Sequence, residues 1–268
     1  MNASKSIIIV GAGHMGSAIA LGLKRSSPHF SITVVEHDVT CWSSVTSAGI
    51  CILETMPELK KIEALILAIP PQTFLKHSKH FVKIQNYAGL IISVMAGITI
   101  SELMRTLNTT QVCRAMPNVP CTLVEGMTVF CCATQTTKEN HALAQSLFSG
   151  LGKWLFVKDE KLLDGATALV GGGPAYVAYF AASLLEYART AGFNEASASY
   201  MVIQLLRGTT VMLEQSGETP VNLCQKVMTA KGTTEQAIKL FDDKQLRSII
   251  VDGLNQACLR SKALAERI

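Results

Sequence analysis

The chain has 268 residues, of which 49% are hydrophobic and only 16% charged, and its formal net charge is +4. This length allows one large domain or two modest ones. The mild charge, without a cluster of lysine and arginine interleaved with aromatics, argues against a nucleic-acid-binding protein. So low a charge content predicts that another subunit covers part of the apolar surface.

Eight cysteines are scattered along the chain, without a C-x-x-C pair or a metal-binding spacing with histidine. We therefore expect no metal site, and we expect core thiols in the reducing cytoplasm. Residues 165–185 are uncharged and long enough to raise the question of a membrane span. Gly171-Gly172-Gly173-Pro174 interrupts this run, which also lacks basic flanks, so we expect a buried helix pair at a subunit contact and no membrane.

The first strong pattern is an apolar run at 7–10 followed by a Gly-x-Gly-x-x-Gly turn. The run is typical of a buried parallel strand. In such a turn the first glycine permits the bend, the second lets the backbone approach a pyrophosphate, and the third allows close helix packing. The following helix start offers free N–H groups to the anion. A dinucleotide site is thus predicted at Gly11, Ala12, Gly13, His14, Met15 and Gly16.

A helix over 15–24 and a strand over 31–35 follow, and Glu36 comes directly after that strand. An acid about twenty residues beyond the glycine motif normally binds the adenosine ribose hydroxyls. The alternative is an ordinary carboxylate at a strand end.

Strands and helices alternate up to about residue 157, which predicts a doubly wound α/β sheet. Further strands are expected at 49–52, 64–69, 90–94, 112–116, 126–133 and 154–157. Helices are expected at 39–47, 72–84, 101–107 (with Ser101 as N-cap) and 138–150. Pro70-Pro71 and Gly97 follow strand ends, where open α/β sheets bind ligands.

Beyond Asp159 the strand signal stops and only helical patterns remain. The expected helices cover 162–170, 175–191, 195–216, 221–228, 234–241 and 243–267. We predict two domains, a Rossmann-type dinucleotide-binding domain over 1–159 and an all-helical domain over 160–268.

Four motifs then occur in a characteristic order: 11–16, 114–120 with 125–128, 171–176 (Gly-Gly-Gly-Pro-Ala-Tyr) and 232–234 (Gly-Thr-Thr). Many dehydrogenases share the first, whereas the combination of the others is specific. With them the whole chain resembles pyrroline-5-carboxylate reductase. The resemblance implies helical domains that interlock in a homodimer or larger homo-oligomer, with each active site at the dimer contact. It also implies hydride transfer from NAD(P)H to the imine carbon of Δ1-pyrroline-5-carboxylate, giving L-proline without a metal.

The resemblance also implies roles for individual residues. Thr167 matches a threonine that hydrogen-bonds the imine nitrogen, although a helical threonine bonded to its own backbone is the alternative. The substrate carboxylate would bind at a helix start, at Thr229, Gly232, Thr233 and Thr234. The cofactor wall would consist of Ala68, Ile69, Pro70, Pro71, Ser93, Ala96, Gly97 and Asn118.

Three departures from the family pattern concern rate and nucleotide preference more than fold. Val170-Gly171-Gly172 replaces Ser-Gly-Ser, Pro70 replaces a lysine, and Lys231 lies where the family often has glycine. Glu36 would repel a 2′-phosphate by roughly 4 kcal/mol, for charges about 4 Å apart at an effective dielectric near 20. His37, however, stands where relatives carry a phosphate-binding arginine. We therefore expect both nucleotides to be used, with a preference for NADH.

Two other functions compete with this interpretation. A β-hydroxyacid-type dehydrogenase would need a lysine facing the cofactor, and the helix that contains Thr167 carries none at an equivalent inward position. A non-catalytic dinucleotide-binding regulator is supported only by the departures at Pro70 and Val170.

Overall fold

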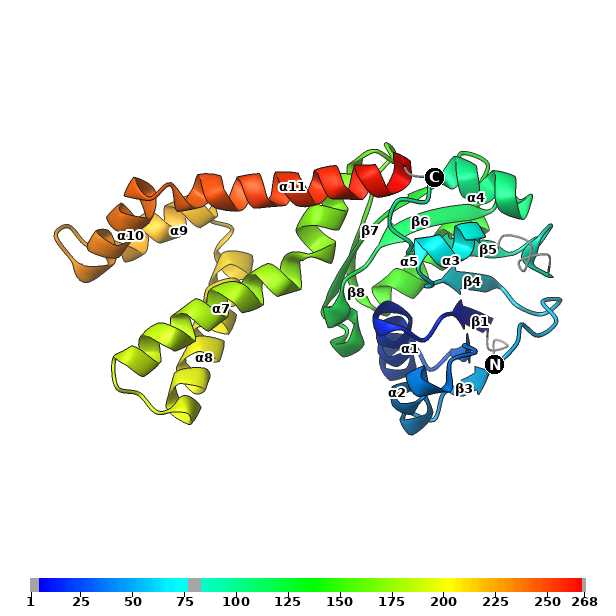
Figure 1. The fold of residues 1–268 in the computed structure, drawn as a ribbon, viewed down its shortest axis with the longest axis horizontal. Coiled ribbons are helices and arrows are strands. Elements are labelled where there is room, and N and C mark those ends of the chain that lie inside the picture. Colours follow the sequence, from blue (N-terminus) through cyan, green and yellow to red (C-terminus); the bar gives the residue numbers. More distant parts are fainter. Residues whose placement is uncertain (1–4, 77–82, 267–268) are drawn as a thin grey trace. The chain divides into compact units, whose positions relative to one another are not determined.

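The structure is a computed structural model that describes residues 5–76 and 83–266, with side chains described up to residue 263 (Figure 1). It divides into two compact units, which are taken separately below. One comprises residues 1–174 with 256–268, and the other comprises residues 175–255. Both boundaries fall inside long helices, α7 (Gly173–Thr190) and α11 (Leu246–Glu266). The predicted division at 159/160 stays a prediction.

The first unit contains one eight-stranded sheet, with the strand order β3-β2-β1-β4-β5-β6-β7-β8. The strands are β1 (Lys5–Val10), β2 (Phe30–Val35), β3 (Cys51–Leu53), β4 (Ala64–Leu67), β5 (Leu90–Ser93), β6 (Val112–Met116), β7 (Gly126–Cys132) and β8 (Gly152–Phe156). The order reverses between β1 and β4, which creates the crevice where doubly wound folds bind nucleotides. The predicted Rossmann-type α/β sheet is confirmed.

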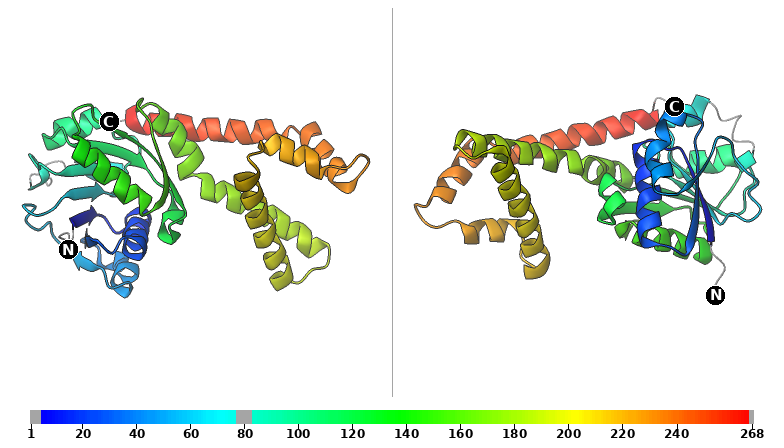
Figure 2. Two further views of the ribbon diagram at one scale, coloured as in Figure 1. Left: turned by 180° about the vertical axis from the view of Figure 1, so that it is seen from behind. Right: turned by 90° about the horizontal axis from the view of Figure 1, so that it is seen from below.

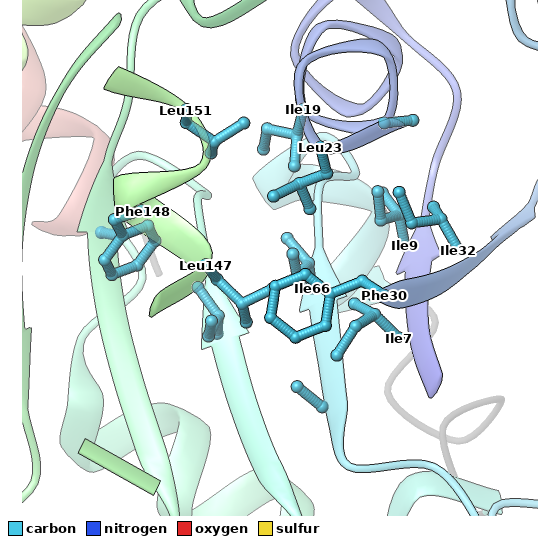
Figure 3. Close-up of a cluster of buried hydrophobic side chains, with 14 of the residues drawn as sticks. Ile7, Ile9, Ile19, Leu23, Phe30, Ile32, Ile66, Leu147, Phe148 and Leu151 are labelled. Atoms are coloured by element: carbon cyan, nitrogen blue, oxygen red, sulfur yellow. The ribbon is translucent and has the colours of Figure 1, made fainter. Parts of the chain in front are cut away.

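Helices cover both faces of this sheet (Figure 2). The helices of one face are α1 (His14–Ser26), α2 (Ser43–Ser47) and α5 (Lys138–Ser149), and those of the other are α3 (Pro71–Lys76) and α4 (Ile100–Leu107). Side chains of a strand alternate between faces. Ile7 and Ile9 therefore pack into the first core cluster (Figure 3), while Ile8 and Val10 pack into the second. This double burial explains the continuous apolar run of β1.

One strand pair departs from the parallel pattern. β6 and β7 are antiparallel, because the link between them contains only the short 3₁₀ helix η3 (Val119–Leu123). A parallel connection needs a crossover of about a dozen residues or more, usually a helix. β8 then returns parallel to β7 after α5.

Three predicted boundaries differ from the structure. The N-cap of α4 is Thr99, whose side chain accepts the Glu102 N–H at 3.2 Å, so Ser101 already lies inside the first turn. The strand predicted over 64–69 ends at Leu67, shortly before Pro70-Pro71, where the chain leaves the sheet. The helix predicted over 72–84 begins at Pro71, and its described part ends at Lys76; residues 77–82 lie outside the described part.

The chain is helical after β8. A π turn, η4 (Thr167–Gly171), separates α6 (Leu162–Ala166) from α7. The remaining helices are α8 (Glu195–Ser216), α9 (Pro220–Val227), α10 (Thr233–Asp243) and α11. The predicted all-helical C-terminal region is thereby confirmed.

The apolar run at 165–185 is not buried within a single chain. It belongs to the helical stretch Leu162–Thr190, which in the described residues is long and apolar enough to cross a membrane by length and composition alone. The mean hydropathy of its most apolar window is 1.4, and 6% of that window is buried. Core helices of soluble proteins pass the same test, and among the described residues little of this window is buried.

Candidate active site

The glycine turn lies between β1 and α1, at the reversal point of the sheet. Gly11 has φ +103°, and a Cβ there would lie 2.6 Å from the Ala68 carbonyl oxygen. A Cβ on Gly16 would lie 2.0 Å from the carbonyl oxygen of Gly11. Only glycine fits these two positions, because any side chain would push the turn away from β4 or α1.

The outer side of the turn is open. A Cβ built on Gly13 meets no described heavy atom within 4 Å. Gly13 is also the N-cap of α1, and no described side chain caps this helix start or places an acid in its first turn. Free N–H groups, the positive end of the helix dipole and room for close approach together fit a pyrophosphate. The predicted site at Gly11 to Gly16 therefore has the geometry that a dinucleotide requires.

Glu36 lies beside this turn, at the end of β2. Its Oε2 accepts the Ala12 N–H and its Oε1 accepts the Asp38 N–H, both at 2.9 Å. Its side chain is 11% exposed, whereas that of His37 is 90% exposed, with Nδ1 3.1 Å from Glu36 Oε1. The carboxylate is thus held in place at the expected ribose position, and its predicted contact with the ribose stays a prediction.

Most of the predicted cofactor wall follows the carboxyl ends of β4, which pairs with β1, and of β5, which pairs with β4. The Ala68 N–H donates to the Val10 carbonyl at 2.8 Å, which joins the wall directly to the end of β1. Ser93 is fully buried, and its hydroxyl accepts the Met95 N–H at 3.3 Å. Gly97 has φ +79°. The nearby residues Ile69 and Ala96 are half-buried, so the wall offers mainly backbone and small side chains.

Other wall residues have structural roles. Pro71 opens α3, the helix position that tolerates a missing N–H best, and the exposed Pro70 precedes it. The Asn118 side-chain oxygen accepts the Met127 N–H at 2.9 Å, which fixes the start of β7. The side-chain nitrogen of Asn118 and the second lone pair of its oxygen are left for a ligand.

Thr167 is the first residue of the π turn and is half-buried. Its hydroxyl donates to the Leu163 carbonyl at 2.7 Å, so the backbone bond considered above as the alternative is present. This bond uses the proton of the hydroxyl and leaves its oxygen lone pairs as acceptors. The turn packs near β6, since a Cβ on Gly171 would lie 3.4 Å from Met116 Sδ.

The predicted carboxylate site belongs to the second unit. Gly232 is the N-cap of the 11-residue helix α10, and no described side chain caps it. The Thr229 carbonyl accepts the Gly232 N–H at 2.9 Å, which folds Thr229 back against the helix start. Thr234 is half-buried and Thr233 exposed. This uncapped start offers N–H donors to an anion, although Glu235 places an acid in the first turn. It lies in a different compact unit from Thr167.

Lys231 has φ +60° and therefore adopts the left-handed backbone that glycine favours. Its N–H donates to Glu235 Oε2 at 2.6 Å. The family often has glycine at this position, so the structure explains that preference in terms of backbone conformation.

The structure contains an ion cluster around Arg114 that the sequence motifs do not predict. Arg114 is 4% exposed, with Nη1 3.0 Å from Glu160 Oε1 and Nη2 3.5 Å from Asp164 Oδ1. The available signal was a lone charge in the middle of the apolar strand Val112-Cys113-Arg114-Ala115-Met116.

Within the described residues, no group of three or more His, Cys, Asp or Glu side chains could hold a metal ion. The eight cysteines are free thiols. Burial raises the pKa of Cys121 and of Cys131 to about 11 in each case. These two side chains therefore remain protonated and pack as small apolar groups.

These features define a Rossmann-type dinucleotide-binding domain. They are a mainly parallel sheet, an open glycine turn at its reversal point, a helix start without a side-chain cap and an acid after the second strand. Comparison with known families agrees with this class. Residues 6–97 match the model of NADP oxidoreductase, coenzyme F420-dependent, and residues 160–264 match the model of pyrroline-5-carboxylate reductase dimerisation.

Individual relatives cover the whole chain. It is 28% identical to pyrroline-5-carboxylate reductase of Pasteurella multocida over 273 residues, 99% of each chain. It is 30% identical to the enzyme of that name from Synechocystis over 207 residues, 76% of each chain. The structure of a pyrroline-5-carboxylate reductase from Coxiella burnetii superimposes with a TM-score of 0.85 at 26% identity, covering 98% of this chain and 99% of the other. The chain belongs to the pyrroline-5-carboxylate reductase family.

Proposed function

We propose that this protein catalyses the NAD(P)H-dependent reduction of Δ1-pyrroline-5-carboxylate to L-proline, the last step of proline biosynthesis. The observation that carries the proposal is the pairing of an open glycine turn with a helical region that matches the family's dimerisation model. The family match extends over the full chain. The protein is accordingly an oxidoreductase that acts on a C=N bond.

The nucleotide would bind across the reversal point of the sheet. The free N–H groups from Gly13 into the first turn of α1 would hold the pyrophosphate, and Glu36 would accept the ribose hydroxyls. Ala68, Ser93, Gly97 and the other wall residues would position the nicotinamide end. The bound reduced nicotinamide supplies the hydride. The protein supplies orientation and electrostatics.

The Thr167 hydroxyl oxygen would accept a hydrogen bond from the substrate nitrogen. A cyclic imine is most electrophilic when its nitrogen is protonated, and the protonated nitrogen is a donor. The Thr167 hydroxyl proton is bonded to the Leu163 carbonyl, so a lone pair on Oγ1 is left to accept this N–H. The same oxygen can accept an N–H of the product amine, so one contact serves throughout the reaction.

The substrate carboxylate would bind at the start of α10, through backbone N–H groups and the hydroxyls of Thr229, Thr233 and Thr234. The helix start lacks a side-chain cap, which leaves its donors for an anion. Such binding would orient the substrate ring for hydride transfer.

Glu36 supports a preference for NADH over NADPH. Its carboxylate is held at the ribose position by two backbone N–H groups and cannot swing away freely. A 2′-phosphate would meet a fixed negative charge there. His37 is exposed and offers the counter-charge that keeps NADPH usable.

The proposal also includes two domains that divide at 159/160. The helical domain would assemble the protein into a homodimer or larger homo-oligomer. The dimerisation match over 160–264 supports it. Large apolar side chains that are exposed in the single chain support it too, among them Tyr179 (80%), Tyr200 (75%) and Tyr187 (73%). Covering them with a second copy accounts for the low charge content, and a reducing cytoplasm suits the eight free thiols.

The deciding experiment is a steady-state assay of purified protein with pyrroline-5-carboxylate, following loss of absorbance of the reduced nicotinamide. We expect substrate-dependent oxidation and formation of proline in equal amounts. Cofactor binding without turnover would instead establish a binding protein. Turnover of a β-hydroxyacid with NAD⁺ in place of the imine would establish the other dehydrogenase class.

A further inference from the structure

Arg114 is a buried cation at the centre of β6 that connects four elements of the first unit. Its Nη1 donates to Glu160 Oε1 at 3.0 Å, and its Nη2 lies 3.5 Å from Asp164 Oδ1 on α6. Glu160 Oε1 also accepts the Ile100 N–H at the first residue of α4, at 2.9 Å. Asp164 Oδ1 also accepts the hydroxyl of Ser261 on α11, at 3.0 Å.

Stability alone is a poor reason for an arginine at this position. Nε and Nη2 of Arg114 are buried and make no hydrogen bond to the described residues. Leaving donors of a buried charge unsatisfied is unfavourable, and replacing a buried ion cluster by apolar side chains is often neutral or stabilising. What the cluster does supply is a link between elements, because Arg114 on β6 faces Glu160 at 3.0 Å and Asp164 on α6 at 3.5 Å.

That placement bears directly on Thr167. Asp164 precedes Thr167 by one helical turn, so the two residues lie on the same face of the helical segment. Leu163, the neighbour of Asp164, supplies the carbonyl that accepts the Thr167 hydroxyl at 2.7 Å. The direction of the Thr167 lone pairs therefore depends on how α6 is held, by the buried Leu163 in the core and by the ion pair of Asp164 with Arg114 on β6.

We propose that Arg114 and Asp164 are positioning residues that fix α6 on β6 and thereby aim the Thr167 oxygen at the substrate nitrogen. The proposal rests on the proposed reduction of a cyclic imine. Neither residue touches the substrate. Their effect passes through Thr167. The loss of a merely stabilising ion cluster would instead weaken the binding of the imine and of the nucleotide and lower the stability of the fold.

The test is a double-mutant cycle that combines Asp164→Asn with Thr167→Ala. Asn keeps the shape of the side chain and an oxygen for Ser261, but it loses the charge that faces Arg114. We expect Asp164→Asn alone to lower kcat/KM for the imine by about tenfold, the scale of a sub-ångström misplacement of a positioned group. In the Thr167→Ala background the same change should have less than a twofold effect, because the group that it aims is absent.

Two controls complete the design. Ser261→Ala removes one hydrogen bond to Asp164 and leaves the ion pair, so it should alter kcat/KM by less than about twofold. The Kd for NADH, measured by fluorescence, should remain unchanged in every variant, since the glycine turn is not touched. If Asp164→Asn fails to fold, Arg114→Lys takes its place, because lysine keeps the charge and loses the two-armed geometry.

The outcomes separate the two proposals. Wild-type protein without turnover overturns the proposed function. Wild-type turnover with equal losses from Asp164→Asn in both Thr167 backgrounds shows a structural cluster and overturns the positioning role. The positioning role is also overturned if Asp164→Asn leaves kcat/KM unchanged, or if Thr167→Ala has no effect and leaves Asp164 nothing to act through.

Discussion

Glu36 Oε2 accepts a hydrogen bond from the backbone N–H of Ala12 at 2.9 Å, which ties the end of β2 to the glycine turn after β1. One carboxylate thus shapes the turn and places a negative charge at the ribose position. A substitution that removes the whole side chain would change both properties at once. The amide oxygen of glutamine can still accept the Ala12 N–H, so Glu36→Gln removes the charge and the bond from the Asp38 N–H but keeps the bond to the glycine turn.

Glu36→Gln should shift nucleotide preference towards NADPH. We expect the ratio of kcat/KM for NADPH to that for NADH to rise by at least about tenfold, because the repulsion of roughly 4 kcal/mol from a fixed charge is removed. Glu36→Ala is the matched variant that also removes the hydrogen bond to the Ala12 N–H. It should weaken the binding of both nucleotides. Steady-state kinetics with each nucleotide measures the ratio, and an unchanged ratio in Glu36→Gln would contradict the role of Glu36.

Thr167→Ala should lower kcat/KM for the imine by about tenfold to a hundredfold, the worth of one hydrogen bond to a charged group (roughly 1.5–3 kcal/mol). Thr167→Ser keeps the acceptor oxygen and should retain most of the activity. Thr167→Val is similar in shape to threonine and should behave like the alanine variant. If the valine variant matches wild type, the hydroxyl contributes nothing to kcat/KM, neither through the substrate nor through its bond to Leu163.

Much of the fold could be predicted because its signals are local. The apolar run of β1, its glycine turn and the alternation of strands and helices each follow from neighbouring residues. The direction of β7 was harder to predict, because it depends on how little helix lies between Pro117 and Glu125. The N-cap of α4 was misplaced since Thr99 and Ser101 are both good caps, and only geometry selects Thr99.

The site was predictable where it depends on motifs and unpredictable where it depends on distant contacts. The open space at Gly13 follows from the glycine pattern. The bond between Glu36 and Ala12 joins two strand ends, and the cluster of Arg114 with Asp164 joins a strand to a helix fifty positions later. No spacing rule encodes such contacts. The one sequence signal for the Arg114 cluster was a single charge in an apolar strand.

Thr167 and the start of α10 lie in different compact units, and the family resemblance implies a site shared between subunits. We therefore expect complementation between Thr167→Ala and Thr234→Ala chains mixed after separate purification. In a mixed dimer one site would combine both substitutions and the other would combine Thr167 of one chain with Thr234 of its partner. Random mixing should restore roughly a quarter of wild-type activity, since half of the dimers are mixed and carry one intact site.

The measurement is the activity of the mixture after denaturation and refolding, compared with that of each variant refolded alone. Mixing without refolding is the control, because interlocked subunits exchange slowly. A mixture no more active than its components would show that one chain supplies both threonines. An active monomer in sedimentation experiments would contradict the shared site as well.

Lys231→Gly should stabilise the helical domain. Lys231 has φ +60°, a conformation that costs a non-glycine residue about 1 kcal/mol or more. Glycine adopts this backbone freely, so we expect the free energy of unfolding to rise by about 1 kcal/mol in chemical denaturation, after allowance for the greater freedom of the unfolded glycine chain. Lys231→Ala is the matched control, because it removes the same charge and keeps the strain. It should leave stability close to that of wild type.

The same pair of variants tests whether Lys231 holds the substrate carboxylate. Its side chain is exposed, and its N–H is bonded to Glu235, whose carboxylate offsets the lysine charge. We expect KM for the imine to change by less than about twofold in both variants, the behaviour of a solvated surface charge. An equal rise in KM in Lys231→Gly and Lys231→Ala would make Lys231 a substrate ligand. A rise in stability that alanine shares would mean that the backbone at this position is not strained.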